Sequence, residues 1–212
     1  MELKEQLEHA LKELRTFPEA QRKFNQSVDL IINLQKFDLK KTPINTFIIV
    51  PHKIKDKKIA GFLEAKNSLI DNSIIPEEFK RYSEKKEVKR LVEEYDFFIA
   101  QASVMPKVAA TFGRALGPSG KMPSPQLGIL MNVDDKEIEK LKTRINSSVK
   151  IRAKEPSIKI AIGKQDMADK DLVDNVLAVY NAIFKLLPKE KDNIKNIELK
   201  FTMTKPAKIK LR

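Results

Sequence analysis

The chain of 212 residues is 42% hydrophobic and 33% charged, which excludes an intrinsically disordered protein and allows one large domain or two small ones. It has no cysteine and two histidines, which excludes disulfides, thiolate catalysis and the usual clusters of metal ligands. No apolar run reaches the roughly 18 residues that span a membrane, and the charged N-terminus is unlike a signal or transit peptide. We therefore expect a cytoplasmic protein without a metal or a membrane partner.

An excess of basic residues is the first indication of function. The chain carries 41 Lys and Arg against 29 Asp and Glu, which gives a net charge of +12. Polyanions such as nucleic acids are the natural partners of such a chain, although some soluble proteins are simply basic. The segment 200–212 contains five cations and no acid.

The first part of the chain predicts one helix and two strands. Apolar residues at helical spacing indicate an amphipathic helix over residues 2–15, and residues 24–34 alternate as in a half-buried strand. Residues 45–51 predict a second strand that ends at Pro51, before the polar, linker-like residues 52–58. The expected inward residues are Leu3, Leu7, His9, Ala10, Leu11 and Leu14 of the helix and Phe24, Gln26, Val28, Leu30, Ile32 and Leu34 of the first strand.

From Lys58 onward, short apolar runs alternate with segments of helical period. This alternation predicts a parallel sheet covered by helices on both sides, as in a small doubly wound domain. The expected strands are residues 59–63, 96–102 and 128–133, and the expected helices are residues 77–94, 104–116 and 135–147.

Past Lys150 the two-residue period returns. Residues 148–154 and 157–164 each have an apolar and a polar face, and a helix is expected over residues 169–187. The two ends of the chain thus predict one antiparallel or mixed sheet with helices behind it, into which the middle is inserted. Near the end of the chain, the expected inward residues are Leu199, Phe201, Met203, Ala207, Ile209 and Leu211, and the outward ones are Lys200, Thr202, Thr204, Lys208, Lys210 and Arg212.

The outward faces of these strands would converge on a surface rich in Lys, Arg and hydroxyl groups. Phosphates suit such a surface, but a solvated sheet face also carries Lys simply to prevent aggregation. No aromatic residue falls on the outward positions, so the stacking platform of single-strand RNA readers is missing. Recognition of RNA through its backbone, 2′-hydroxyl groups and shape is therefore favoured.

Motifs of nucleotide-binding and hydrolytic enzymes are missing from the sequence. Gly113, Gly117 and Gly120 do not form G-x-G-x-x-G, and Gly120 with Lys121 lacks the rest of a P-loop. Paired acids fall at helix ends or on solvated helix faces, where acids are common. We expect no catalytic residue and no cofactor; the alternative is a nucleotide-dependent enzyme that uses the middle domain.

The stretch RALGPSGKMPSPQLG, residues 114–128, is dense in glycine and proline. The helix before it is expected to end at Gly117 as a left-handed cap, because Pro118 would prevent its continuation. A rigid, protruding and weakly basic loop would result. A tight helix-to-strand connection with no further role is the alternative interpretation.

The same stretch, with Gly113 before it, resembles the signature loop of the ribosomal protein L1 family. The resemblance continues in order along nearly the whole chain, in KFNQSVDLIINL, VPH, DFFIAQASVMP, AIGK, and FTM with PAKIKL. An ordered series of motifs is more specific than any single glycine pattern. On these residues the chain is identified as a member of that family, most similar to its archaeal-type members.

The resemblance implies an α/β protein of two domains. Domain I, residues 1–55 and 151–212, would be a split β-α-β sandwich that is built from both ends of the chain and binds RNA. Domain II, residues 57–150, would be an inserted Rossmann-like three-layer α/β domain. Two hinge strands would fall at residues 51–57 and near Lys150.

The function that the resemblance implies is structural. Family members bind a helical junction of large-subunit rRNA, form the mobile stalk near the tRNA exit site and assist the release of deacylated tRNA. Many also repress translation by binding their own mRNA. The implied partners are therefore large-subunit rRNA, E-site tRNA and the chain's own mRNA, and the implied state of the chain away from the ribosome is a monomer.

The resemblance also assigns RNA contacts to residues near the start of the chain. Lys23, Phe24, Ser27 and Asp29 match a strand motif in which the cation meets phosphate, while hydroxyl and carboxylate groups bond to 2′-hydroxyls. The alternation of the predicted strand places the Phe24 side chain inward. A position in the core and a contact with RNA are therefore equally open interpretations for Phe24.

Further contacts are assigned near the end of the chain. Lys159 stands where the family often has His, and Lys164 matches the Lys after the family's glycine. Thr202 and Met203 match the first two residues of a Thr-Met-Gly triad, but Thr204, also expected to contact RNA, and Lys205 stand where one glycine is usual. In the signature loop, Ser119 replaces a common cation, which weakens any phosphate contact there.

Overall fold

The computed structural model describes residues 3–39, 42–153 and 155–209, so the positions expected for Lys210, Leu211 and Arg212 lie outside the described residues. The fold is mixed α/β and divides into two compact units. Unit 1 is Met1–Lys55 with Ser147–Arg212, and unit 2 is Asp56–Asn146.

The main sheet of unit 1 joins the two ends of the chain. Its strands are β1 (Ser27–Leu34), β8 (Ser157–Lys164), β9 (Ile194–Phe201) and β10 (Ala207–Ile209), in the order β10-β9-β1-β8. Every neighbouring pair is antiparallel, which decides between the antiparallel and mixed sheets expected from sequence. The strand from the start of the chain therefore lies between two strands from its end.

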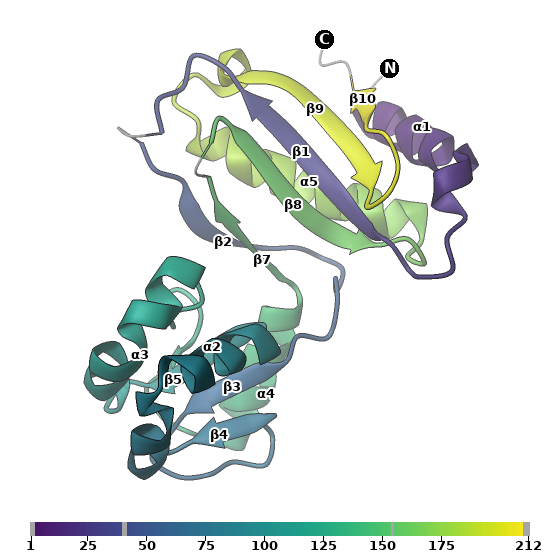
Figure 1. The fold of residues 1–212 in the computed structure, drawn as a ribbon. Helices are drawn as coiled ribbons and strands as arrows, with labels where there is room; N and C mark the ends of the chain where they lie inside the picture. The colour runs from purple at the N-terminus through teal and green to yellow at the C-terminus, as the bar shows by residue number, and fades with distance from the viewer. Residues whose placement is uncertain (1–2, 40–41, 154, 210–212) are drawn as a thin grey trace. The chain divides into compact units, whose positions relative to one another are not determined.

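Helices cover one face of this sheet. In Figure 1, α5 (Asp169–Leu186) lies behind β1, β8 and β9, and α1 (Leu3–Thr16) lies beside it, near β10. Alternate residues of β1, from Val28 to Leu34, are buried against these helices, as the two-residue period predicted. His9, expected on the apolar side of α1, is exposed instead. The remaining short elements of unit 1 are the 3-10 turns η1 (Pro18–Ala20) and η3 (Glu190–Asn193).

The strands β2 (Asn45–Ile49) and β7 (Ser148–Arg152) form a separate antiparallel pair, so the prediction of one sheet was wrong for them. Their inward residues still join the core of unit 1. On the opposite face, the Lys150 Nζ atom lies 4.9 Å from the centre of the Phe47 ring. Burial, with a smaller effect from Arg152, lowers the pKa of Lys150.

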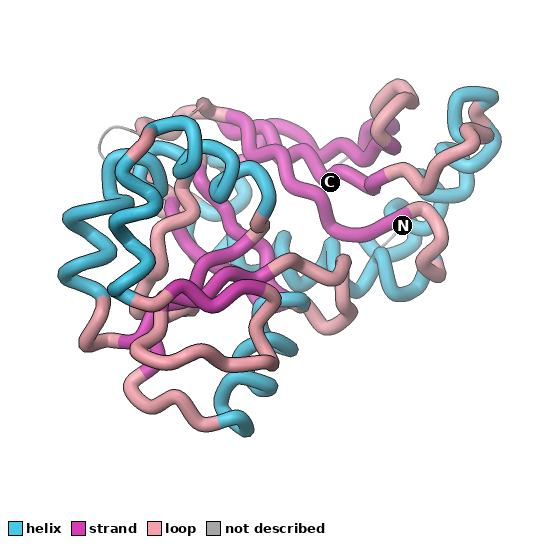
Figure 2. Tube along the Cα trace, turned by 60° about the horizontal axis from the view of Figure 1, so that its bottom comes forward, coloured by secondary structure: helices cyan, strands magenta, loops and turns pink. Residues whose placement is uncertain are grey.

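Unit 2 is built on a parallel sheet. Its strands are β3 (Ile59–Phe62), β4 (Asn72–Ile74), β5 (Phe97–Gln101) and β6 (Ile129–Leu130), in the order β4-β3-β5-β6. Helices lie on both sides of the sheet (Figure 2). One side packs Phe62, Phe98 and Phe112 together, and the other packs Ile59 and Ile99 against Ile138. This agrees with the doubly wound arrangement expected from sequence.

Two details of unit 2 differ from the sequence prediction. The expected helix 77–94 is a 3-10 segment η2 (Pro76–Ser83) followed by α2 (Lys85–Glu94), because Glu84 has extended backbone with ψ of 131°. The short strand β4 was not predicted, since its three residues are too few to show a period. The remaining helix, α4, covers Asp135–Asn146.

The helix before the glycine-rich loop is longer than predicted. Helix α3 (Met105–Ser119) continues through Gly117 and Pro118, and it ends at Gly120, which has a left-handed φ of 73°. A proline in the last turn removes one N–H, while its φ still fits a helix. Lys121 then donates from Nζ to the carbonyl oxygens of Val92 and Tyr95 at 2.6 and 2.7 Å, at the end of α2. The cation in this loop therefore supports the fold of unit 2.

Unit 2 begins and ends side by side. The Lys57 backbone N–H donates to Asn146 Oδ1 at 3.0 Å, and the Lys57 Nζ atom donates to the Ile145 carbonyl at 2.6 Å. In unit 1, the Val50 N–H donates to the Ser147 carbonyl at 2.8 Å and extends the pairing of β2 with β7.

Gly163 of β8 has no room for a side chain. A Cβ atom there would lie 2.4 Å from Leu172 Cδ2 and 2.7 Å from Met167 Sδ, and Leu172 is fully buried. We expect Gly163→Ala to destabilise unit 1 by about 1–3 kcal/mol through overpacking.

Gly113 of α3 provides the contrasting substitution, because a Cβ atom there would meet nothing within 4 Å. We expect Gly113→Ala to stabilise unit 2 by about 0.5–1 kcal/mol, since alanine loses less backbone entropy in a helix. Native-state hydrogen exchange measures the two units separately. Equal effects of the two substitutions would contradict the packing described for Gly163.

Candidate nucleic-acid interface

The first residues of β1 lie beside the last residues of β8 and β9. Because β1 is antiparallel to both, Ser27 pairs with Lys164 of β8 and Val28 pairs with Phe201 of β9. The residues expected from sequence at 23–29, 164 and 202–203 therefore gather at one end of the sheet.

Ser27 is the centre of this cluster. Its hydroxyl oxygen accepts a hydrogen bond from Lys164 Nζ at 3.1 Å. Its backbone N–H donates to Thr202 Oγ1 at 3.1 Å, and its carbonyl accepts from the Thr202 N–H at 3.1 Å. These contacts join residues that are 137 and 175 positions apart in the chain. We call Ser27, Lys164 and Thr202 the hydroxyl–lysine cluster.

Asp29 adds a carboxylate next to the cluster. It lies opposite Lys200 on β9 and follows a bulge in the pairing with β8. Burial raises the pKa of Asp29, while the charges of Lys200 and Lys164 lower it in part. Burial thus disfavours the charged form of Asp29, and the two lysine charges offset this only in part.

Lys23 and Phe24 precede β1 and are exposed. The Phe24 side chain is 53% exposed, so the core position allowed by its alternation is wrong. The reason is that β1 begins at Ser27 and the strand period does not extend back to Phe24. Phe24 is thus an exposed aromatic side chain beside this end of the sheet, and the expectation that no aromatic residue falls on an outward strand position is wrong for Phe47 of β2, which shares a face with Lys150.

The orientations expected for Met203 and Thr204 are reversed. Met203 is 52% exposed, whereas Thr204 is 4% exposed. The chain leaves β9 at Phe201 and turns, and Thr204 closes this turn because its Oγ1 accepts from the Phe201 N–H at 2.9 Å. Its hydroxyl group is thus used inside the protein, and Thr204 does not belong to the exposed surface.

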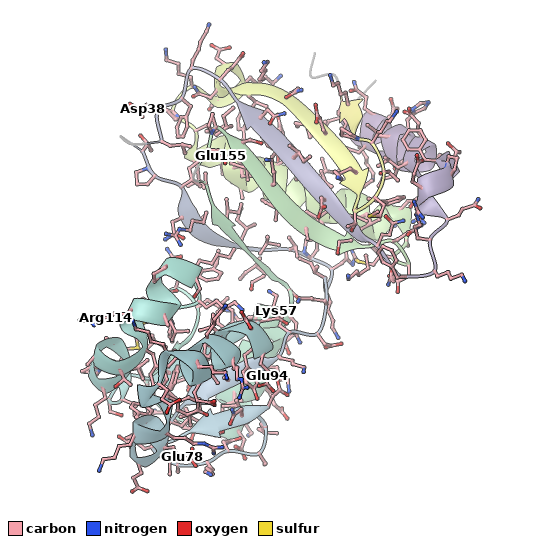
Figure 3. The ribbon with its side chains drawn as sticks, in the orientation of Figure 1. Asp38, Lys57, Glu78, Glu94, Arg114 and Glu155 are labelled. Carbon is pink, nitrogen blue, oxygen red and sulfur yellow. The ribbon has the colours of Figure 1, made fainter. Side chains whose placement is uncertain are left out.

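Lys159 is exposed on β8, five residues before Lys164, which corresponds to about 17 Å along a strand. Its Nζ atom lies 3.9 Å from a carboxylate oxygen of Glu155, which Figure 3 labels at the opposite end of the sheet from the cluster. Lys159 therefore extends the same open face rather than joining the cluster.

The open face of the sheet is less uniformly basic than the sequence prediction. It carries Lys159, Lys164, Lys200 and Lys208, but also Asp29 and Glu198. Hydroxyl groups and exposed apolar side chains concentrate at the end that contains the cluster. The face is thus mixed in charge, with its basic and hydroxyl groups closest together at that end.

Gln26 is the residue that sequence reasoning missed. The alternation of the strand predicted an inward position for Gln26 among apolar residues, and its side chain is fully buried. Its Nε2 atom donates to the carbonyl oxygens of Glu19 and Ala20, and its Oε1 accepts from the Met203 N–H at 2.9 Å. A polar residue at an inward strand position was the available signal, because buried amides require hydrogen-bond partners.

These groups can bind a polyanion without catalysing a reaction. Lysine ammonium groups attract phosphate, and hydroxyl and carboxylate oxygens accept bonds from ribose hydroxyls. Among the described residues, no group of three or more His, Asp or Glu side chains is placed to hold a metal ion. Within the same residues, no helix is both long and apolar enough to cross a membrane.

Comparison with known proteins identifies the family. The chain matches the model of the ribosomal protein L1p/L10e family over residues 11–205. The large ribosomal subunit protein uL1 of Methanothrix thermoacetophila is 36% identical over 213 residues, which cover 95% of this chain and 97% of the relative. The proteins of the same name from Thermofilum pendens and Thermococcus kodakarensis are 37% and 34% identical, covering 96% and 89% of this chain and 92% and 89% of their own lengths.

These relatives are named as archaeal ribosomal proteins and not as enzymes, which agrees with the noncatalytic character expected from sequence. The similarity includes the ends of the chain that form the hydroxyl–lysine cluster. The chain therefore belongs to the ribosomal protein L1 family.

Proposed function

We propose that the chain is a component of the large ribosomal subunit and binds large-subunit rRNA through the hydroxyl–lysine cluster and its neighbours. The names of the relatives support assembly into this subunit. The observation that carries the proposal is the set of 3.1 Å hydrogen bonds that joins Ser27 to Lys164 and Thr202. It fixes a cation and two hydroxyl groups at one exposed end of a rigid sheet.

Each group has a distinct task in this proposal. Lys23 and Lys164 contact phosphates, and Ser27, Asp29 and Thr202 bond to 2′-hydroxyls. The exposed side chains of Phe24 and Met203 add apolar contacts with ribose and base. Lys159 contacts a more distant phosphate along the same face. Hydroxyl and carboxylate groups read the presence of ribose more than the identity of bases, so the target is a folded RNA of defined shape.

A second surface of unit 1 fits a second RNA. The outward face of the β2–β7 pair carries Lys150 over the Phe47 ring and also Arg152, which is exposed. Cations with an aromatic ring suit contacts with RNA backbone and stacked bases. We propose that this face contributes to contacts with E-site tRNA, as expected for a stalk protein that assists the release of deacylated tRNA.

Repression of the chain's own mRNA is the second candidate function. The cluster recognises ribose and phosphate geometry, so an mRNA fold with the same geometry as the rRNA junction would bind to the same face. The protein away from the ribosome, proposed to be a monomer, would carry out this repression. Competition between the rRNA fragment and the chain's own transcript for purified protein tests it; simultaneous binding of both RNAs would exclude a shared face.

Chemical footprinting on purified large-subunit rRNA tests the main proposal. We expect protection confined to one helical junction, and the protected fragment then serves as the ligand in all the following measurements. Uniform weak protection along the whole RNA would contradict specific binding.

Substitutions in the cluster and at Lys23 should weaken binding to this fragment, and those of the two lysines should also change its salt dependence. For Lys164→Ala or Lys23→Ala, the slope of log K against log salt should fall by about 0.9 for each phosphate that the variant no longer neutralises in a duplex-like target. Thr202→Ala should reduce affinity with little change in slope, because a neutral hydroxyl releases no counterion.

Arg114→Ala is the matched control, because Arg114 extends from α3 of unit 2 (Figure 3). It should change affinity less than the cluster substitutions. Filter binding over a salt series, with melting curves for every variant, gives both quantities. Equal losses from all four substitutions would point to non-specific charge and against the cluster.

Asp29 should show opposite effects on folding and on binding. Because burial raises its pKa above the ordinary value of 3.8, the charged form is disfavoured in the folded state. The stability it contributes is therefore present at low pH and lost as pH rises through the folded-state pKa. We expect Asp29→Asn to stabilise the protein at pH 7 and to have little effect below pH 3.8.

The same substitution should reduce discrimination between ribose and 2′-deoxyribose at the contacted positions, since a charged acceptor bonds a hydroxyl more strongly than an amide does. Urea unfolding at the two pH values and binding of deoxy-substituted fragments measure the two effects. A destabilised Asp29→Asn variant at pH 7 would show that the carboxylate serves the fold instead.

A further inference from the structure

The buried side chain of Gln26 links three segments that meet behind the hydroxyl–lysine cluster. Its Nε2 atom donates to the Glu19 and Ala20 carbonyl oxygens at 2.9 and 3.2 Å, in the 3-10 turn η1. Its Oε1 atom accepts from the Met203 N–H at 2.9 Å, in the turn after β9. The amide thus uses both its donor and its acceptor on main-chain groups, and this fixes which way it points.

The main chain and a neighbour of Gln26 complete the link. The Gln26 carbonyl accepts from the Gln165 N–H at 2.9 Å, directly after Lys164. Gln165 Nε2 donates to the Ala20 carbonyl at 2.9 Å, so it joins the same turn. Arg15 of α1 donates to the Gln165 carbonyl at 2.9 Å and is paired with Asp169. These hydrogen bonds therefore fix the positions of Gln26 and Gln165, which are next to Ser27 and Lys164 of the cluster in the chain.

We propose that Gln26 is a positioning residue for RNA binding: its amide holds the 202–203 turn so that Thr202 and Met203 are presented beside Ser27. The inference rests on the proposed function of the cluster. Gln26 itself is 0% exposed and does not touch RNA. It acts through the partly buried Met203 N–H, which would lose this partner if the amide were removed, so that another arrangement of the turn would compete with the one observed.

Asn193 offers a matched control at the other end of the same strands. It is also a fully buried amide, and its Nδ2 atom donates to the Gln35 and Lys36 carbonyls at 3.1 Å. Its Oδ1 atom accepts from the Lys189 N–H at 2.8 Å. Asn193 precedes β9 and bonds to residues that follow β1, so it links loops away from the cluster. Loss of either amide should destabilise the protein by a similar mechanism.

The test compares Gln26→Met with Asn193→Leu, substitutions that keep side-chain size and remove the hydrogen bonds. Three properties are measured on the full chain: thermal stability, affinity for the protected rRNA fragment over a salt series, and exchange of the Met203 N–H by NMR. Gln26→Met removes the side-chain bonds to Glu19, Ala20 and Met203. We expect faster exchange at Met203 and an affinity about tenfold lower, which corresponds to about 1.4 kcal/mol.

The salt slope of Gln26→Met should equal that of the wild type, because every phosphate contact is kept, whereas Lys164→Ala should lower it. Asn193→Leu should lose stability but keep RNA affinity within about twofold. This contrast separates positioning of the cluster from general loss of stability.

Wild-type affinity in Gln26→Met, or an equal loss of affinity in folded Asn193→Leu, would overturn the inference. Failure of the wild-type chain to bind the fragment would instead refute the proposed function. If Gln26→Met does not fold, Gln26→Asn replaces it: this variant keeps the amide but shortens its reach by one methylene, so the Met203 N–H should again be freed and affinity reduced. Unchanged exchange and affinity in that variant would likewise reject the role of Gln26.

Discussion

The antiparallel insertion of β1 between β8 and β9 is the constraint on which the rest of unit 1 depends. It satisfies the backbone of the central strand on both sides and orients its alternate apolar residues toward α1 and α5. The same register places Ser27 beside Lys164 and Thr202. The strand pairing that forms the core of unit 1 therefore also assembles the hydroxyl–lysine cluster.

Behind that surface, polar side chains fix the turns at which the strands end. Gln26, Gln165 and Arg15 bond mainly to backbone groups, and each hydrogen bond contributes about 1 kcal/mol when both partners are satisfied. Unsatisfied, the same buried groups would cost more than they contribute. The exposed residues that we propose to contact RNA are thus supported by a buried layer in which polar and apolar packing are combined. Among the proposed contact residues, Asp29 is half-buried, and burial raises its pKa.

Sequence periodicity predicted most strands and helices of both units, the mixed α/β class and most of the core, because burial enforces alternation inside an element. It failed where elements end. Phe24 lies outside β1, and Thr204 folds back to bond Phe201, so neither follows the strand period. Helix α3 passes Pro118 because a last-turn proline loses only one bond. The family resemblance, not the pattern, indicated the site residues, and neither indicated the role of Gln26, because its bond to the Met203 N–H joins segments 177 positions apart.

The meeting of Lys57 with Asn146 has a consequence for the order of folding. Strand β2 ends at residue 49 and strand β7 begins at residue 148. In an unfolded chain, their pairing must therefore close a loop of roughly 100 residues. Once the inserted segment is folded, the gap is reduced to roughly ten residues, which lowers the entropic cost of closure by about 2 kcal/mol. During synthesis we therefore expect the inserted segment to become compact first. Unit 1 would fold only after β9 has emerged from the ribosome that synthesises the chain, because until then β1 can pair with β8 alone.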